Sequence, residues 1–177
     1  MRDGFEKALK FVLGHEGGFS HHPHDPGGMT NLGVTRAVWE AYTGRPADEA
    51  TMRGLTREAV TPLYRKRYWD SCRCDDLPDG IDLCVFDTAV NMGPTEASRI
   101  LQRSIGLRAD GIIGDRTIAA VVDIPADGLI SDFSAERRGT YKKIRNYKTF
   151  GSGWIARANA CERVAYRMAD GFLPLSA

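Results

Sequence analysis

A glutamate and an aspartate lie on either side of a glycine-rich loop near the N-terminus. Glu16 opens the run Glu-Gly-Gly-Phe, and Asp25 opens the run Asp-Pro-Gly-Gly, which Thr30 follows. Cleavage of a glycosidic bond uses two carboxyl groups, one to protonate the leaving oxygen and one to stabilise the developing cation or to activate water. A threonine hydroxyl is suited to orienting that water. Glu16, Asp25 and Thr30 are therefore candidate catalytic residues.

A helix is expected to position the glutamate. Apolar residues recur at helical spacing at Phe5, Leu9, Val12 and Leu13. This spacing predicts a helix over residues 3–15, ended by Gly17 or Gly18. Carbonyl groups at that end of a helix disfavour an ionised carboxylate, and a protonated glutamic acid is what a general acid requires. The alternative interpretation is a solvated glutamate before an ordinary turn, with Asp25 and Thr30 as turn and capping residues.

Longer runs extend the pattern beyond this loop. They are Glu16–Phe19, Asp25–Gly28, Thr30–Thr35, Tyr68–Asp70 and Phe86–Gly93. In order and spacing they resemble glycoside hydrolase family 108, the lysozyme-like N-acetylmuramidases of phage endolysins and bacterial secretion. The resemblance implies cleavage between N-acetylmuramic acid and N-acetylglucosamine, with Glu16 as the catalytic residue. Phage lysozymes often place eight and five residues between their Glu, Asp and Thr, whereas four separate Asp25 from Thr30 here.

The second half of the chain resembles a peptidoglycan-binding region. The residues that carry this resemblance are Leu101, Gln102, Gly106, Asp110, Gly111, Gly114, Thr117, Gly153, Trp154 and Arg157. We therefore expect a catalytic region over residues 1–93 and a helical peptidoglycan-binding region over residues 94–177. Because no low-complexity linker separates them, we expect the two regions to share a core and to unfold together.

Sugar rings have apolar C–H faces and polar rims, so a glycan cleft needs flat aromatic surfaces with amide donors nearby. The resembling runs offer these groups at Phe19, Asn31, Tyr68, Trp69 and Asn91. Tyr68 and Trp69 are equally suited to the core. We predict that Asn31 and Asn91 face the same groove as Glu16, from opposite walls.

Two alternative functions stay open at this point. A lytic transglycosylase needs only the one acid and releases an anhydro sugar. A non-catalytic wall-binding or secretion-assisting module would use the same cleft only to hold glycan. The presence of Glu16 favours catalysis, and phage-type host lysis is the expected setting.

The amino-acid composition limits the classes of partner that the protein can bind. The chain has 177 residues, of which 42% are hydrophobic and 27% charged, enough for one ordinary core. A net charge of +1 lacks the basic excess of nucleic-acid-binding proteins, so no nucleic acid is expected. A local basic stretch comprises Arg137, Arg138, Lys142, Lys143, Arg145 and Lys148. It is interpreted as the solvated face of a helix, or as a contact for the acidic peptides of the wall.

The sequence also bears on location and cofactors. No apolar run approaches the ~20 residues that span a membrane, and the N-terminus lacks the apolar core of a signal peptide. We expect a monomer made in the bacterial cytoplasm, without stable membrane association, that reaches the wall in the periplasm through a holin or another export route. Cys72 and Cys74 lack a matching second pair, and His21, His22 and His24 fit no standard ligand spacing. Neither a metal nor another cofactor is predicted.

The expected fold is α+β, predominantly α-helical and lysozyme-like, with a small β-hairpin between residues 19 and 35. Capping and proline signals predict helices over residues 35–42, from 56, and from 62 to 69. Further helices are expected over residues 81–93, 94–105, from 115, 126–147 and 153–168. The end of the helix over residues 81–93 is a candidate cleft wall.

Overall fold

The computed structural model describes residues 2–21 and 28–171, with side chains from Gly4 onward. The chain forms two compact units, a helical unit (residues 1–8 and 68–177) and a hairpin unit (residues 9–67). Helix α1 (Arg2–His15) begins in the helical unit and ends in the hairpin unit. The fold is predominantly helical with one small antiparallel sheet, as predicted. None of the helices in the described ranges is long and apolar enough to cross a membrane.

The hairpin unit contains the small sheet. Strands β1 (Thr30–Asn31) and β2 (Val34–Thr35) pair antiparallel. Leu32 and Gly33 connect them, with φ angles of 48° and 71°. Positive φ at both central residues is the geometry of a type I′ turn, whose twist matches that of the strands. The prediction of a short hairpin between residues 19 and 35 is confirmed.

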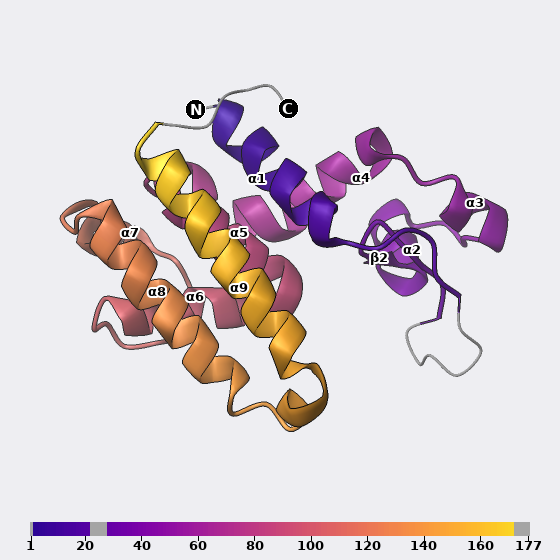
Figure 1. The fold of residues 1–177 in the computed structure, drawn as a ribbon. Coiled ribbons are helices and arrows are strands. Elements are labelled where there is room, and N and C mark those ends of the chain that lie inside the picture. Colours follow the sequence, from indigo (N-terminus) through magenta and orange to yellow (C-terminus); the bar gives the residue numbers. More distant parts are fainter. Residues whose placement is uncertain (1, 22–27, 172–177) are drawn as a thin grey trace. The chain divides into compact units, whose positions relative to one another are not determined.

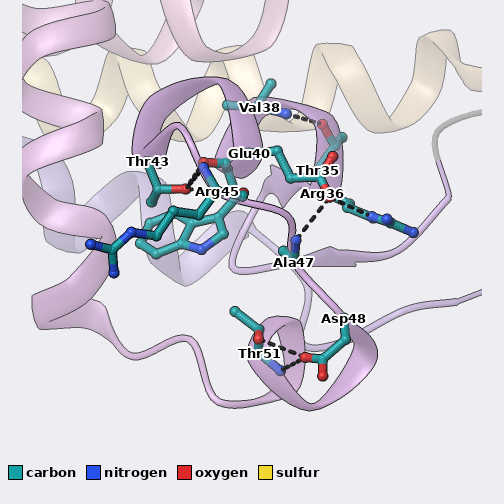
Figure 2. A network of polar contacts seen from close by, with 10 residues as sticks. Thr35, Arg36, Val38, Glu40, Thr43, Arg45, Ala47, Asp48 and Thr51 are labelled. Atoms are coloured by element: carbon teal, nitrogen blue, oxygen red, sulfur yellow. Dashed lines mark hydrogen bonds and ion pairs between the residues drawn. The ribbon is translucent and has the colours of Figure 1, made fainter.

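Short capped helices surround the sheet in this unit. They are α2 (Arg36–Thr43), α3 (Glu49–Arg53) and α4 (Arg57–Tyr64). Figure 2 shows the cap of α2, where Thr35 accepts a hydrogen bond from the Val38 N–H, and the cap of α3, where Asp48 accepts one from the Thr51 N–H. Glu40 accepts from the Ala47 N–H at 2.8 Å and so ties α2 to the segment before α3. These side chains satisfy N–H groups that a helix start leaves without partners.

Pro62 does not open a new helix, which corrects the expectation of a separate helix over residues 62–69. It lies inside α4, which begins after the predicted cap Thr56. A proline inside a helix supplies no N–H and crowds the carbonyl four residues earlier. The chain continues through Arg65–Trp69 as a π-helix, η1, in which the hydrogen bonds span one residue more.

The helical unit is built mainly from long helices. After the short turns η2 (Asp70–Cys72) and η3 (Cys74–Asp76), its helices are α5 (Ile81–Met92), α6 (Pro94–Ser104), α7 (Asp115–Val122), α8 (Ala126–Tyr141) and α9 (Tyr147–Ala169). Helix α5 packs against α6, α8 and α9. Nearly all of α5 is buried, so it forms the core of this unit.

A charged cluster lies inside that core. Asp87 of α5 is fully buried and accepts hydrogen bonds from Arg137 Nη2 at 2.7 Å and Arg157 Nε at 2.9 Å. Burial alone would raise the pKa of the Asp87 carboxyl, but the two guanidinium groups outweigh it and hold the pKa below its ordinary value. Arg137 Nε also donates to the Tyr141 hydroxyl at 2.9 Å. The cluster therefore ties α5 to both α8 and α9.

Helices α8 and α9 run side by side in opposite directions (Figure 1). The predicted helices end at residue 147 and begin at residue 153, whereas α8 ends at Tyr141 and α9 begins at Tyr147. Gly151 and Gly153 thus lie inside α9. A β-carbon at Gly151 would lie 2.5 Å from the Tyr147 ring, so the ring packs on the glycine and the helix tolerates it. The correction moves half of the basic stretch, Lys142, Lys143 and Arg145, out of a helix and into the connection between α8 and α9.

Candidate active site

Glu16 lies where α1 ends, as the sequence predicts. Its backbone N–H bonds to the Val12 carbonyl at 3.1 Å, which continues the helical hydrogen-bond pattern by one residue. The side chain is half-buried, and the two glycines that follow are exposed. The helix thus sets the position of the carboxyl group, while Gly17 and Gly18 keep the next turn free of side chains.

The turn of the hairpin lies against this carboxyl group. A β-carbon built at Gly33 would lie 2.6 Å from Glu16 Oε2 and 2.5 Å from the Tyr64 hydroxyl. Both groups therefore approach the bare α-carbon of Gly33 more closely than any larger residue allows. Tyr64 is buried, and its hydroxyl donates to the Leu32 carbonyl at 2.8 Å. The hairpin turn, Tyr64 and Glu16 form one contiguous group in the hairpin unit.

Thr30 lies in β1, on the strand that leads to this turn. Its N–H and carbonyl exchange hydrogen bonds of 2.9 and 2.8 Å with Ser20, so β1 is bonded on both sides. Thr30 lies opposite Thr35, and both are half-buried. Asp25 lies outside the described residues. The catalytic roles of Asp25 and Thr30 stay predictions.

Two of the expected binding residues belong to the hairpin unit. Phe19 is half-buried, and the Arg53 guanidinium lies 3.9 Å from its ring centroid, a cation–π contact over one ring face. Asn31 is 6% exposed, and its amide nitrogen donates to the Met52 carbonyl at 2.8 Å. Asn31 therefore joins β1 to α3, and a contact with sugar for either residue stays a prediction.

Trp69 occupies the core of the helical unit. It is 1% exposed and meets the rings of Phe5 and Phe86 edge-on, at centroid distances of 5.3 and 5.4 Å. Its Nε1 donates to Asp75 at 3.0 Å. Since its ring faces are covered, a sugar has no access to them. This position corrects the expectation of a binding role and gives Trp69 a structural one.

Asn91 and Tyr68 are the remaining expected binding residues, and both lie in the helical unit, where Asn91 is exposed and Tyr68 is half-buried. Asn91 lies in the last turn of α5, where its Oδ1 accepts a hydrogen bond from the Tyr141 hydroxyl at 2.7 Å. It lines an open pocket. A groove shared by Asn91, Asn31 and Glu16 stays a prediction, as does sugar binding by Tyr68.

Comparisons with known proteins identify the family of this chain. Residues 9–93 match the family model of glycosyl hydrolase 108, and residues 96–159 match a predicted peptidoglycan domain. The solved structure of SagA from Brucella abortus is 37% identical and superimposes with a TM-score of 0.86 over 96% of this chain and 97% of that one. The chain belongs to glycosyl hydrolase family 108. A comparison with curated proteins found no match.

Membership of family 108 makes the chain a glycoside hydrolase of the N-acetylmuramidase type, with peptidoglycan as its partner. The two family matches meet between residues 93 and 96, near the predicted boundary, whereas the compact units divide at residue 68. The reason is the packing of α5 against α6, α8 and α9. By sequence, α5 ends the hydrolase match, and by packing it belongs with the helices that follow.

The structure adds Tyr64 and Gly33 to the residues that surround the candidate acid of this hydrolase. Gly33 stands in one of the resembling runs, but no spacing in the sequence indicates that it faces Glu16. Tyr64 follows the apolar pattern of α4 and has the signature of a core residue, which it also is. Only the fold brings its hydroxyl to a turn 32 residues earlier in the chain.

Neither the cysteines nor the acidic residues of the described segments form a metal site. Within those segments no group of three His, Cys, Asp or Glu side chains is arranged to hold a metal ion. Cys72 and Cys74 are buried, and burial raises the pKa of the Cys72 thiol to about 11. Because a metal ligand must be a thiolate, this environment disfavours the zinc interpretation.

Proposed function

We propose that Glu16 is the general acid with which this N-acetylmuramidase cleaves the β-1,4 bond between N-acetylmuramic acid and N-acetylglucosamine. The supporting observation is the placement of its carboxyl group at the end of α1, against the α-carbon of Gly33 and beside the Tyr64 hydroxyl. A bare turn leaves room at the carboxyl group for a polymer, and a helix end restricts how the side chain moves. General-acid catalysis depends on such fixed geometry.

In the proposed reaction, the Glu16 proton goes to the glycosidic oxygen as the bond from that oxygen to the anomeric carbon breaks. The bonding electrons leave with the oxygen, and an oxocarbenium-like centre develops on the sugar. Asp25 stabilises this centre or activates the water that attacks it, and Thr30 orients that water. Water forms a new bond to the anomeric carbon and gives up a proton to the carboxylate that activates it, which completes hydrolysis and leaves a reducing muramic end.

The biological setting forms part of the proposal. A hydrolase with a peptidoglycan domain has to meet the wall, so we propose action in the periplasm after synthesis in the cytoplasm. Phage-type lysis with a holin supplies one such route, and we propose that the enzyme works as a monomer. Expression with and without a holin tests this setting. Lysis that needs no export partner would contradict it.

Mass spectrometry of digested sacculi tests the chemistry. The wild-type enzyme is expected to release fragments with reducing muramic ends. Glu16→Gln keeps the size of the side chain and removes its transferable proton, so cleavage should fall by at least ~10²-fold. Equal melting temperatures of the two proteins serve as the control. Anhydro ends would indicate a lytic transglycosylase, and intact glycan from the wild-type enzyme would indicate a binding module.

A second measurement addresses Asp25. Asp25→Asn should also impair turnover, and near-normal activity of the folded variant would remove Asp25 from the mechanism. Nuclear magnetic resonance of the first product gives its anomeric configuration. Retention corresponds to carboxyl groups ~5 Å apart and inversion to ~6.5–9.5 Å. The anomeric configuration of the product thus reports the distance between the Glu16 and Asp25 carboxyl groups.

A further inference from the structure

An open pocket of about 230 Å³ lies in the helical unit, between the end of α5 and the connection from α8 to α9. Its lining residues are Asn91, Met92, Tyr141, Ile144 and Trp154. Sites that enclose a drug-sized ligand are larger, about 300–1,000 Å³. The pocket therefore suits a single ring or side group of a longer polymer that lies across its mouth.

Aromatic rings continue from the pocket onto the surface. Tyr141 and Trp154 have ring centroids 5.5 Å apart, and Trp154 and Phe150 have centroids 6.1 Å apart. Both pairs are tilted, with interplanar angles of 34° and 33°. Tyr141 is 1% exposed, so Trp154 and Phe150 supply the accessible part of this aromatic row. Phe150 is 54% exposed and Ile144 36%, unusual for large apolar side chains of this protein. Such an aromatic surface matches the C–H face of a sugar ring.

A polar side chain, that of Asn91, lines the same pocket as these rings. The Tyr141 hydroxyl donates to Asn91 Oδ1, so the amide of Asn91 is oriented and its nitrogen is the donating end. Tyr141 is itself oriented by Arg137, which is paired with Asp87. An oriented amide beside aromatic rings is a fitting partner for the acetamido group of an N-acetyl sugar.

The stretch of sequence that supplies most of the pocket is rich in positively charged residues. Residues 137–161 contain seven Arg or Lys and no Asp or Glu, in a chain whose net charge is only +1. Arg137 pairs with Asp87, and Arg138 pairs with Glu162. The cations that remain on the connection and the start of α9 are exposed, namely Lys142, Lys143, Arg145 and Lys148. They flank Ile144, which lines the pocket.

We propose that this surface binds a peptide-bearing N-acetyl sugar of peptidoglycan. The surface, here called the α8–α9 platform, comprises the pocket, Phe150 and the four exposed cations. The sugar packs on Trp154 and Phe150, its acetamido group meets Asn91, and the carboxylates of the stem peptide meet the lysines. Charge complementarity selects this occupant over a neutral glycan, and the peptidoglycan-domain match covers the platform from Tyr141 to Trp154. The proposal rests on the function proposed above.

Sedimentation with purified sacculi tests the platform in the full-length Glu16→Gln background, where the wall stays intact. Phe150→Ser should weaken binding about fivefold, because truncation of a contact aromatic typically has an effect of this order. Its matched control is Ile112→Ser, since Ile112 is 71% exposed in the same unit and lies outside the pocket. Melting temperatures confirm that each variant is folded. Equal binding by the two variants would overturn the aromatic contact.

The charges are tested with sacculi from which an amidase has removed the stem peptides. The double variant Lys142→Glu, Lys143→Glu should weaken binding to intact sacculi about tenfold at low salt, and the loss should shrink as ionic strength rises. The control Arg116→Glu, Arg163→Glu changes exposed residues by the same charge. On peptide-free glycan the lysine variant should bind like this control. An equal loss on both substrates would contradict the contact with the peptide.

The platform and the proposed function can fail separately. If the wild-type enzyme releases no reducing ends but binds sacculi through the platform, the muramidase proposal fails and the platform stands. If the enzyme releases reducing ends and the platform variants bind like their controls, the platform proposal fails alone.

Discussion

Position 33 has no side chain, and two functional groups use the space that one would occupy. Glu16 and Tyr64 both approach its α-carbon, and its φ of 71° lies in the left-handed region. Glycine meets both demands at once, since it has no β-carbon and adopts positive φ without strain. The position of the proposed acid thus depends on a residue that carries no chemistry of its own.

Gly33→Ala is therefore expected to reduce catalysis more than stability. The new methyl group must displace the Glu16 carboxyl, and a shift of about 1 Å at a reacting group can lower the rate ~10²-fold. Gly44→Ala is the matched control, because Gly44 has a φ of 68° and a β-carbon there would meet nothing within 4 Å. Release of reducing ends and melting temperature are measured for both. Equal activities would contradict the proposed crowding.

Asp82, at the start of α5, gives the protein a pH dependence that does not involve catalysis. Burial raises the pKa of this carboxyl to about 7, although the Leu83 and Gly80 N–H groups that donate to its Oδ1 oppose the shift. Its pKa in the unfolded chain is near 3.8. The native state thus binds the proton more tightly, and the resulting stabilisation, complete below pH 4, is lost as pH rises through 7.

Asp82→Asn should remove this part of the pH dependence. The asparagine keeps an oxygen for both N–H donors and carries no charge to bury. The wild-type melting temperature should fall more between pH 5 and pH 8 than that of the variant. Asp132→Asn, at an exposed position of α8, should leave the wild-type slope unchanged. Parallel curves for Asp82→Asn and the wild type would refute the assignment.

Helix α5 holds the helical unit together through one buried carboxylate. Arg137 from α8 and Arg157 from α9 both pair with Asp87. The net contribution of such a pair relative to an apolar core is small, but removal of one partner leaves buried charge without compensation. Replacement of only one of these three charged residues is therefore expected to destabilise the packing of the three helices.

Asp87→Asn is expected to destabilise the protein by about 3–5 kcal/mol, because two guanidinium groups would lose their counter-ion inside the core. Denaturant unfolding at pH 7 measures the change in free energy of unfolding. The exposed Asp132→Asn again serves as control. A loss under about 1 kcal/mol, the scale of a surface ion pair, would show that water compensates the arginines.

The elements that the sequence predicts well have both a periodic pattern of apolar residues and a capping or glycine residue at an end. Helix α1 has its apolar repeat and the glycines after Glu16, and α2 has its capping Thr35. The sequence misplaces the connection between α8 and α9 because residues 142–146 contain neither glycine nor proline, while Gly151 looks like a break. The Tyr147 ring packs on Gly151 one helical turn later, so the glycine stays inside α9. The hydrophobic period alone does not indicate this contact.

In the candidate site, too, local sequence indicates some of the residues and fails to indicate others. Glu16 is identified by its motif and its position after a helix, both of which are local. Tyr64 and the burial of Trp69 depend on residues far away along the chain, so no spacing indicates them. Sequence patterns therefore predict the chemical groups of this site better than they predict the residues that hold them in place.

The family matches and the compact units divide the chain at different points. A fragment that ends at Gly93 keeps α5 but lacks α6, α8 and α9, against which α5 packs. The apolar side chains of α5 would then face water, at about 25 cal/mol for each Å² exposed. The hydrolase match alone is thus expected to lack a complete core.

The fragment of residues 1–93 should therefore show no cooperative thermal unfolding, in contrast to the full-length chain. Circular dichroism and size-exclusion chromatography are the measurements. A folded, monomeric fragment with a sharp transition would show that the boundary near residue 93 separates independent domains. It would also contradict a shared core.

The buried cysteine thiols can be used to measure local opening of the folded protein. All four cysteines, Cys72, Cys74, Cys84 and Cys161, lie in the helical unit with at most 1% exposure, and residues 9–67 contain none. Because only an exposed thiolate reacts, a thiol reagent labels the native chain at the rate at which this unit opens. Because the hairpin unit contains no thiol, it contributes no labelling of its own. Labelling of the unmodified enzyme thus reports the opening of the helical unit apart from that of the hairpin unit.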